Sequence, residues 1–199
     1  MSVIVELPRT WVTSLERRLV TATSQTSSPF TGTTEVQDWG GEWWEYDIAF
    51  AAQSGSLARS ASAALTALGS GRGLLLFADP SIEVKNLTQS ITLQLAVTGG
   101  NLLQTQGWPP GLPAVSSGDF LSIGTGRDRR LHQVGFDVVA NANGQAALTI
   151  FPSIRQSLPA GTVLEVNQPK VLLRPTSSVP TRIERVARYQ FTMSAREAI

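Results

Sequence analysis

Hydrophobic and polar residues alternate one by one along most of this 199-residue chain, which is the pattern of β-strands with one buried face. The clearest case is GGEWWEYDIAFA at residues 40–51. Interpreted as a strand, it has one face of large apolar side chains, namely Trp44, Tyr46, Ile48 and Phe50. The opposite face holds an aromatic residue and two acids, Trp43, Glu45 and Asp47. The sequence predicts that the first face lies in a core.

The second face of this strand allows two interpretations. An aromatic residue beside two acids is an odd surface for a monomer, but it suits a subunit that meets a neighbour. On this interpretation Trp43, Glu45 and Asp47 are interface residues. On the other, Trp43 packs under a helix and both faces of the strand are internal, as is common in sheets that helices flank.

One segment has helical periodicity instead. In SGSLARSASAALTAL, residues 54–68, the apolar residues recur at intervals of three and four. Ser54 or Ser56 can serve as the N-cap, and Gly69 is placed to end the helix. The many alanines predict a helix that packs closely on a sheet.

Further strands are predicted between turn residues. LLLF at residues 74–77 is bounded by glycine and by Asp79-Pro80, which is typical of a buried strand. ITLQLAV at residues 91–97 alternates strictly. The proline-rich GWPPGLP at residues 107–113 cannot form regular structure, and we interpret it as a domain boundary.

Four or five short strands follow this loop, with a turn at Asn143-Gly144, and together they predict a compact small β-barrel. The last strand is amphipathic, with Ala187, Tyr189, Phe191 and Met193 on one face. It needs a sheet to join, and the first part of the chain supplies one.

We therefore predict a mainly β protein with a minor α part, built from two domains. Residues 1–97 and 169–199 form one discontinuous domain that contains the helix. Residues 98–168 form an inserted small barrel.

Composition excludes some classes of function. Sixteen Lys and Arg nearly balance fifteen Asp and Glu, so no strong field favours nucleic acid or an anionic membrane as the main partner. There is no cysteine for a disulfide or a thiolate site. We find no signal peptide or membrane span in the sequence and expect a protein made in the cytoplasm, without a membrane partner.

The sequence offers little for catalysis. The single His132 lies in an alternating strand, which favours a structural role. There is no Gly-x-Ser-x-Gly motif and no His or Cys pair at metal-ligand spacing. We therefore expect no enzyme, no catalytic residue, no cofactor and no metal. Trp108, in the proline-rich loop, is the one candidate for stacking on a ligand such as a sugar.

Nearly the whole chain carries an ordered series of short motifs. In the first half these are LP at Leu7-Pro8, G..W at Gly41–Trp44, an Ala- and Leu-rich helix ending in glycine at Ser56–Gly69, and F.DP at Phe77–Pro80. In the second half they are GD.L.IG at Gly118–Gly124, RL..V at Arg130–Val134, G.A.L.I.P..R at Gly144–Arg155, LPAGT at Leu158–Thr162 and P...L at Pro169–Leu173, before a terminal strand ending in Arg-Glu-Ala. In order and spacing, the series resembles the siphophage distal tail protein family, whose members form the ring that joins the tail tube to the tail tip.

The resemblance implies a structural virion protein at the tail tip: a hexameric ring of β-sandwich-like belt domains, each carrying an oligonucleotide/oligosaccharide-binding-like (OB-like) barrel that faces outward. The implied partners are further copies of the chain, the tail tube protein, the tail-tip hub protein and the tape-measure protein. Genomic DNA would pass through the lumen without specific binding. The alternative is a related tail-tip or minor tail protein whose barrel binds a host-surface carbohydrate, with Trp108 at the site.

Overall fold

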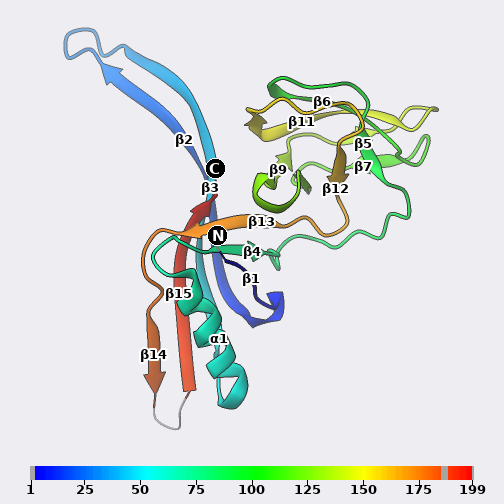
Figure 1. Cartoon of the computed structure of the whole chain (residues 1–199). Helices are drawn as coiled ribbons and strands as arrows, with labels where there is room; N and C mark the ends of the chain where they lie inside the picture. The colour runs from blue at the N-terminus through cyan, green and yellow to red at the C-terminus, as the bar shows by residue number, and fades with distance from the viewer. Residues whose placement is uncertain (1–2, 185–187, 199) are drawn as a thin grey trace.

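The computed structural model describes residues 3–184 and 188–198. It confirms the prediction of a mainly β protein with a minor helical part. The strands form one open sheet, one closed barrel and a separate two-stranded pair (Figure 1). Short 3₁₀ turns lie at Arg9–Trp11 and Gly126–Asp128.

The open sheet has the strand order β1-β4-β13-β15-β3-β2, and β14 pairs with β15 beside this path. Its strands are β1 (Ile4–Glu6), β2 (Val12–Ser27), β3 (Thr34–Gln53), β4 (Leu74–Phe77), β13 (Val171–Pro175), β14 (Thr181–Glu184) and β15 (Arg188–Glu197). Only β1 and β4 are parallel, and the other pairs are antiparallel. The terminal strand β15 therefore joins strands from the start of the chain. Ala187, which we placed on its apolar face, lies outside the described residues.

Strands β2 and β3 form a long hairpin whose far half projects from the sheet as an arm (Figure 1). We define the arm as residues 21–41. At its base the strand register shifts between Thr21 and Thr23. Gly40 has a φ of 69°, and a Cβ on Gly41 would lie 2.7 Å from that of Ala22. Gly40 and Gly41 thus form a β-bulge, which bends the β2–β3 hairpin where it leaves the sheet.

The single helix of the described chain, α1 (Gly55–Leu68), confirms the predicted helix. Gly69, with a φ of 54°, ends it as expected. The buried face of α1 includes Ala61 and Leu65, which belong to the same core as Tyr46 and Ile48 of β3. Small residues on this face let the helix lie close to the sheet.

The barrel closes in the order β11-β6-β5-β12-β8-β9. Its strands are β5 (Ile91–Leu93), β6 (Gly100–Gln106), β8 (Phe120–Ile123), β9 (Arg130–Val134), β11 (Gln145–Ile154) and β12 (Val163–Glu165), and beside them β7 (Pro113–Val115) pairs with β10 (Val138–Val139). The barrel has a core of its own that is separate from the core under the helix.

The domain boundary that we placed at residue 98 needs correction. Strand β5 pairs with β12 and β6, and the buried side chains of Ile91 and Leu93 lie in the barrel core. The barrel therefore already includes residues 91–93. Likewise, the loop at residues 107–113 is no boundary, because Trp108 lies inside the barrel core.

Two linkers connect the sheet to the barrel, and they are tied to each other by Asn167. Its side-chain oxygen accepts the backbone N–H of Leu87 at 2.8 Å, and its amide donates to the carbonyl of Leu87 at 2.9 Å. The N–H of Lys85 donates to the carbonyl of Asn167 at 2.9 Å. The segment that leads into the barrel and the segment that leaves it are thus held side by side.

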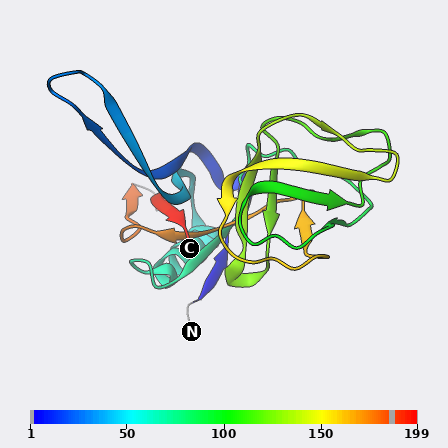
Figure 2. The ribbon, with the colours of Figure 1, turned by 90° about the horizontal axis from the view of Figure 1, so that it is seen from above.

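The helix and the barrel pack on the same face of the sheet. Phe120 and Leu131 of the barrel belong to the core that contains Trp44 and Leu65. The rings of Trp44 and Phe120 have centroids 5.7 Å apart. Figure 2 shows the barrel and the arm extending from the sheet in different directions. One face of β3 is therefore covered by two elements, and Trp43 lies on the other.

Candidate interface and the contacts that orient it

The three predicted interface residues lie on the face of the sheet opposite α1. Trp43, Glu45 and Asp47 are each half-buried, whereas the alternate residues of β3 are buried in the core under the helix. The alternative in which Trp43 packs under the helix is wrong, because α1 covers the Trp44 face. We call the face that carries Trp43, Glu45 and Asp47 the open face.

Hydrogen bonds fix the side chains on the open face. The Trp43 indole Nε1 donates to Oε1 of Glu45 at 3.1 Å. Arg18 of β2 donates to Glu45 at 3.0 Å and to Asp47 at 2.9 Å. Ser194 of β15 donates to the second carboxylate oxygen of Asp47. These strands are neighbours in the sheet, so the network crosses β2, β3 and β15.

The network also sets the charges of the open face. The hydrogen bond from Trp43, followed by that from Arg18, holds the pKa of Glu45 below its usual value. The hydrogen bonds from Ser194 and Arg18 lower the pKa of Asp47 in the same way. Both carboxylates are therefore ionised at neutral pH and held in place, which gives the open face a defined polar pattern instead of mobile side chains.

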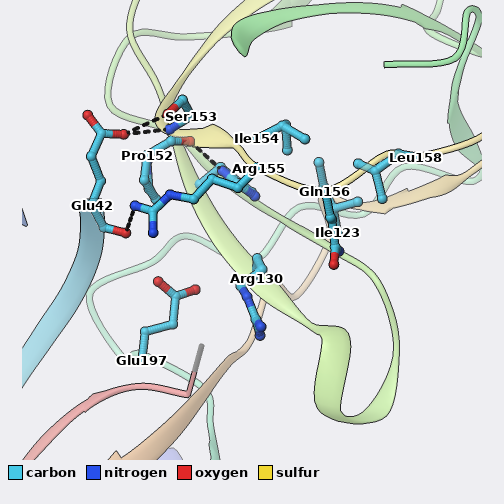
Figure 3. A pocket seen from close by; sticks show the side chains of 11 residues that line it. Glu42, Ile123, Arg130, Pro152, Ser153, Ile154, Arg155, Gln156, Leu158 and Glu197 are labelled. Atoms are coloured by element: carbon cyan, nitrogen blue, oxygen red, sulfur yellow. Dashed lines mark hydrogen bonds between the residues drawn. The ribbon is translucent and has the colours of Figure 1, made fainter. Parts of the chain in front are cut away.

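On the other side of the sheet, a cavity of about 120 Å³ lies between β3 and the barrel (Figure 3). Glu42 of β3 points toward the barrel, where its carboxylate accepts the Ser153 backbone N–H at 2.7 Å and the Ser153 hydroxyl at 3.0 Å. Arg155 donates to the backbone carbonyl of Glu42. The polar groups at this cavity thus tie the sheet to the barrel.

Glu197, at the end of β15, is a buried carboxylate at this junction, with only 2% of the residue exposed. It accepts the backbone N–H of Leu131 in the barrel at 3.0 Å and that of Trp44 in the sheet at 3.4 Å. Burial raises the pKa of Glu197, and these two hydrogen bonds partly oppose the shift. The Trp44 indole Nε1 completes the contact by donating to the Leu131 carbonyl at 2.9 Å.

Arg17 reinforces the same junction from β2. Its guanidinium lies 4.1 Å from the ring centroid of Phe120 in the barrel and 5.6 Å from that of Trp44 in the sheet. It also forms an ion pair with buried Asp79, in the linker that leads to the barrel. A cation that contacts both aromatic rings and a buried carboxylate holds the two units in one orientation.

His132 is buried in strand β9. Its Nδ1 lies 2.7 Å from the carbonyl oxygen of Pro152, and since a carbonyl only accepts, Nδ1 carries the proton. Burial lowers the pKa of His132 to about 4, so the ring is neutral at pH 7. Its hydrogen bond joins β9 to β11, two strands that also pair through their backbones.

Trp108 requires a correction. We proposed it as a residue that stacks on a ligand, but it is only 2% exposed, and its indole Nε1 donates to Oγ1 of Thr105 at 2.7 Å inside the barrel core. The proline-rich loop turns the large ring inward, where burying it is favourable. No face of the indole is open to a sugar.

No group of three or more His, Cys, Asp or Glu side chains in residues 3–184 and 188–198 is placed to hold a metal ion. In the same part of the chain, no helix has the length and apolar character needed to cross a membrane.

Sequence reasoning missed several of these residues, including Glu42, Arg155 and Glu197. One signal was present for Glu197. In the terminal strand it falls on the same face as Phe191, Met193 and Ala195, and an acid that continues an apolar face is either paired or bound by backbone groups. No local pattern singled out Glu42 or Arg155.

No family model matches this chain, and no curated protein matches it at a significant level of similarity. Function is therefore inferred from the residues and their arrangement.

Proposed function

We propose that this protein is a structural component of a long non-contractile phage tail. It forms a homohexameric ring at the tail tip that joins the tail tube to the hub and lets the genome pass. The observation that carries the proposal is the asymmetry of the sheet: one face is covered by α1 and the barrel, while the open face holds Trp43, Glu45 and Asp47 in fixed positions.

A closed ring requires two different surfaces on every subunit, since each copy meets one neighbour with each of them. The open face supplies one candidate surface. The arm supplies another, because every residue from 29 to 40 is exposed, including Phe30 at 95% and Trp39 at 66%. Large apolar side chains exposed together on a projecting ribbon are typical of a surface that meets a partner.

The fixed junction between sheet and barrel also suits a ring subunit. The hydrogen bonds that Glu42 and Glu197 accept and that Trp44 donates hold the barrel in one orientation on the sheet. Six such subunits would present six barrels at one radius, and in the proposed arrangement the barrels face outward. The near-zero net charge of +1 supports a lumen that does not retain DNA.

The rival function, binding of a host carbohydrate by the barrel, loses its proposed residue because Trp108 is buried. The open face and the arm, which belong to the sheet, favour assembly over this function. In the proposed ring the neighbouring proteins are the tail tube, hub and tape-measure proteins.

Antibodies against the purified protein test this placement directly. On negatively stained particles of the phage that encodes the chain, gold label should gather at the tail tip, and prior absorption of the antibodies with the protein should remove it. Label along the whole tail, or on no part of the particle, would overturn the proposal.

A further inference from the structure

We propose that the arm of one copy docks in an arginine-lined cavity on the neighbouring copy, with Glu35 as the anion that this cavity receives. The inference rests on the proposed function, because it names two surfaces that meet in the ring. A second copy of this chain is the occupant.

The cavity has a volume of about 230 Å³ and lies beside the open face. Trp43, Arg155, Arg174, Arg196 and Glu197 line it. Arg174 of β13 and Arg196 of β15 lie directly opposite each other in the strand register. Like charges in that position repel each other, so an anion bound between them would reduce this repulsion.

No carboxylate among the described residues forms an ion pair with these arginines. Glu45 of β3 lies opposite Arg196 in the strand register, but its carboxylate accepts from Trp43 and Arg18. Arg155 and Arg174 donate to the backbone carbonyls of Glu42 and Gly71. Arg196 is exposed and forms no ion pair with any described residue. The one carboxylate at the cavity, that of Glu197, already accepts two backbone N–H groups.

The chemistry of this cavity suits a partner surface that carries both a carboxylate and an aromatic side chain. Guanidinium groups bind carboxylates through paired, charge-assisted hydrogen bonds. Trp43 adds an aromatic wall that can contact a second ring.

The arm has the complementary chemistry. Residues 21–41 contain two acids, Glu35 and Asp38, and no Lys or Arg. Neither acid forms an ion pair within the described residues. Glu35 shares a face of the ribbon with exposed Trp39, because strand residues four apart point the same way. An acid and an indole thus lie on one exposed face of the ribbon.

The arm cannot reach the cavity of its own chain. Glu35 is eight residues from Trp43 along β3, which is on the order of 25 Å in an extended strand. The arm also points away from the sheet (Figure 1). The contact therefore joins two copies head to tail, and a head-to-tail contact closes into a ring when its rotation allows.

A charge-reversal pair tests the contact. The variants Arg196→Glu and Glu35→Arg should each raise the protein concentration needed for half-assembly by about tenfold or more, and the double variant should recover most of that loss. Light scattering over a concentration series measures the concentration of half-assembly. The matched controls are two substitutions at exposed positions, Arg59→Glu on α1 and Glu83→Arg in the linker. Both should leave the concentration of half-assembly unchanged. Thermal unfolding of each variant shows whether the subunit itself is intact.

The outcomes separate this inference from the proposed function. If the wild-type protein forms no ring, the function fails. If it forms a ring that Arg196→Glu leaves as stable as before, or if the double variant assembles no better than the single variants, the docking contact is overturned and the ring stands. Retention of the wild-type protein on DNA that Arg196→Glu abolishes, with assembly unchanged, would also overturn it and assign the cavity to nucleic acid.

Discussion

The backbone N–H of Leu131, in the barrel, donates a 3.0 Å hydrogen bond to the carboxylate of Glu197, in the last strand of the sheet. The second oxygen of the same carboxylate accepts the N–H of Trp44. One buried acid near the end of the chain thus connects the inserted barrel to the sheet from which it departs. This contact fixes the direction in which the barrel projects.

The first prediction concerns Glu197. Because its pKa is raised by burial, the folded protein binds a proton here more tightly than the unfolded chain. The stability that this group contributes is fully present below about pH 4.5, the pKa of the group in the unfolded chain. It is lost as the pH rises through the raised pKa of the folded protein. Relative to the wild type, Glu197→Gln should therefore become more stable as pH rises from 4.5. Urea unfolding across pH measures the difference.

The control for this experiment is Glu83→Gln, at an exposed position in the linker. The unfolding free energy of this variant should equal that of the wild type at every pH. If the difference in unfolding free energy between Glu197→Gln and the wild type stays constant across pH, Glu197 does not have the raised pKa that its burial requires.

For His132, the expected change of stability with pH has the opposite sign. Burial lowers its pKa from 6.5 to about 4, so the unfolded chain takes up the proton first as pH falls. The wild type should lose up to about 3 kcal/mol of stability through this group between pH 6.5 and 4. His132→Leu should lack that loss and be less stable at pH 7, because the bond to Pro152 is gone. A wild-type profile as flat as that of the variant would contradict the prediction.

Trp44 and Trp39 form a matched pair for the junction. Trp44→Phe removes the indole donor to the buried Leu131 carbonyl and should cost about 1–3 kcal/mol of unfolding free energy. Trp39 is exposed in the arm, and Trp39→Phe should change the monomer by less than about 0.5 kcal/mol. Urea unfolding measures both under conditions that keep the protein monomeric. Equal losses of unfolding free energy in the two variants would show that the hydrogen bond from Trp44 to Leu131 does not stabilise the junction.

Trp43→Ala tests the open face. If this face is an interface, removing the half-buried indole should raise the concentration for half-assembly by about tenfold or more, since aromatic residues dominate interface energies. Leu57, exposed on α1, provides the control Leu57→Ala. Sedimentation velocity over a concentration series measures assembly. The prediction fails if the two variants assemble alike.

Much of the fold could be predicted from local pattern. Alternation separated the two faces of β3, and the spacing of apolar residues located α1 together with its terminal Gly69. Local pattern could not tell which face of β3 the helix covers, because that depends on packing between elements distant in sequence. The assignment of Trp43 therefore stayed open until the structure placed α1 on the Trp44 side.

The errors have the same origin. Strand β5 has three residues and pairs with β12, about seventy residues later, so nothing near Ile91 marks the start of the barrel. Trp108 sits in a proline-rich loop that we interpreted as a domain boundary, yet its ring fills the barrel core. The junction residues are far apart in the sequence: Glu42 lies in β3, Arg155 directly after β11 and Glu197 in β15. Only folding brings them together.

The most direct measurement for the central claim is the solution mass of the purified protein by light scattering over a concentration series, followed by negative-stain class averages. We predict a species of about 128 kDa, six times the 21.3 kDa of one chain, that appears as a ring with a central hole. A protein that remains at 21.3 kDa at every concentration, and forms no ring when purified tail tube protein is added as a template, would contradict it.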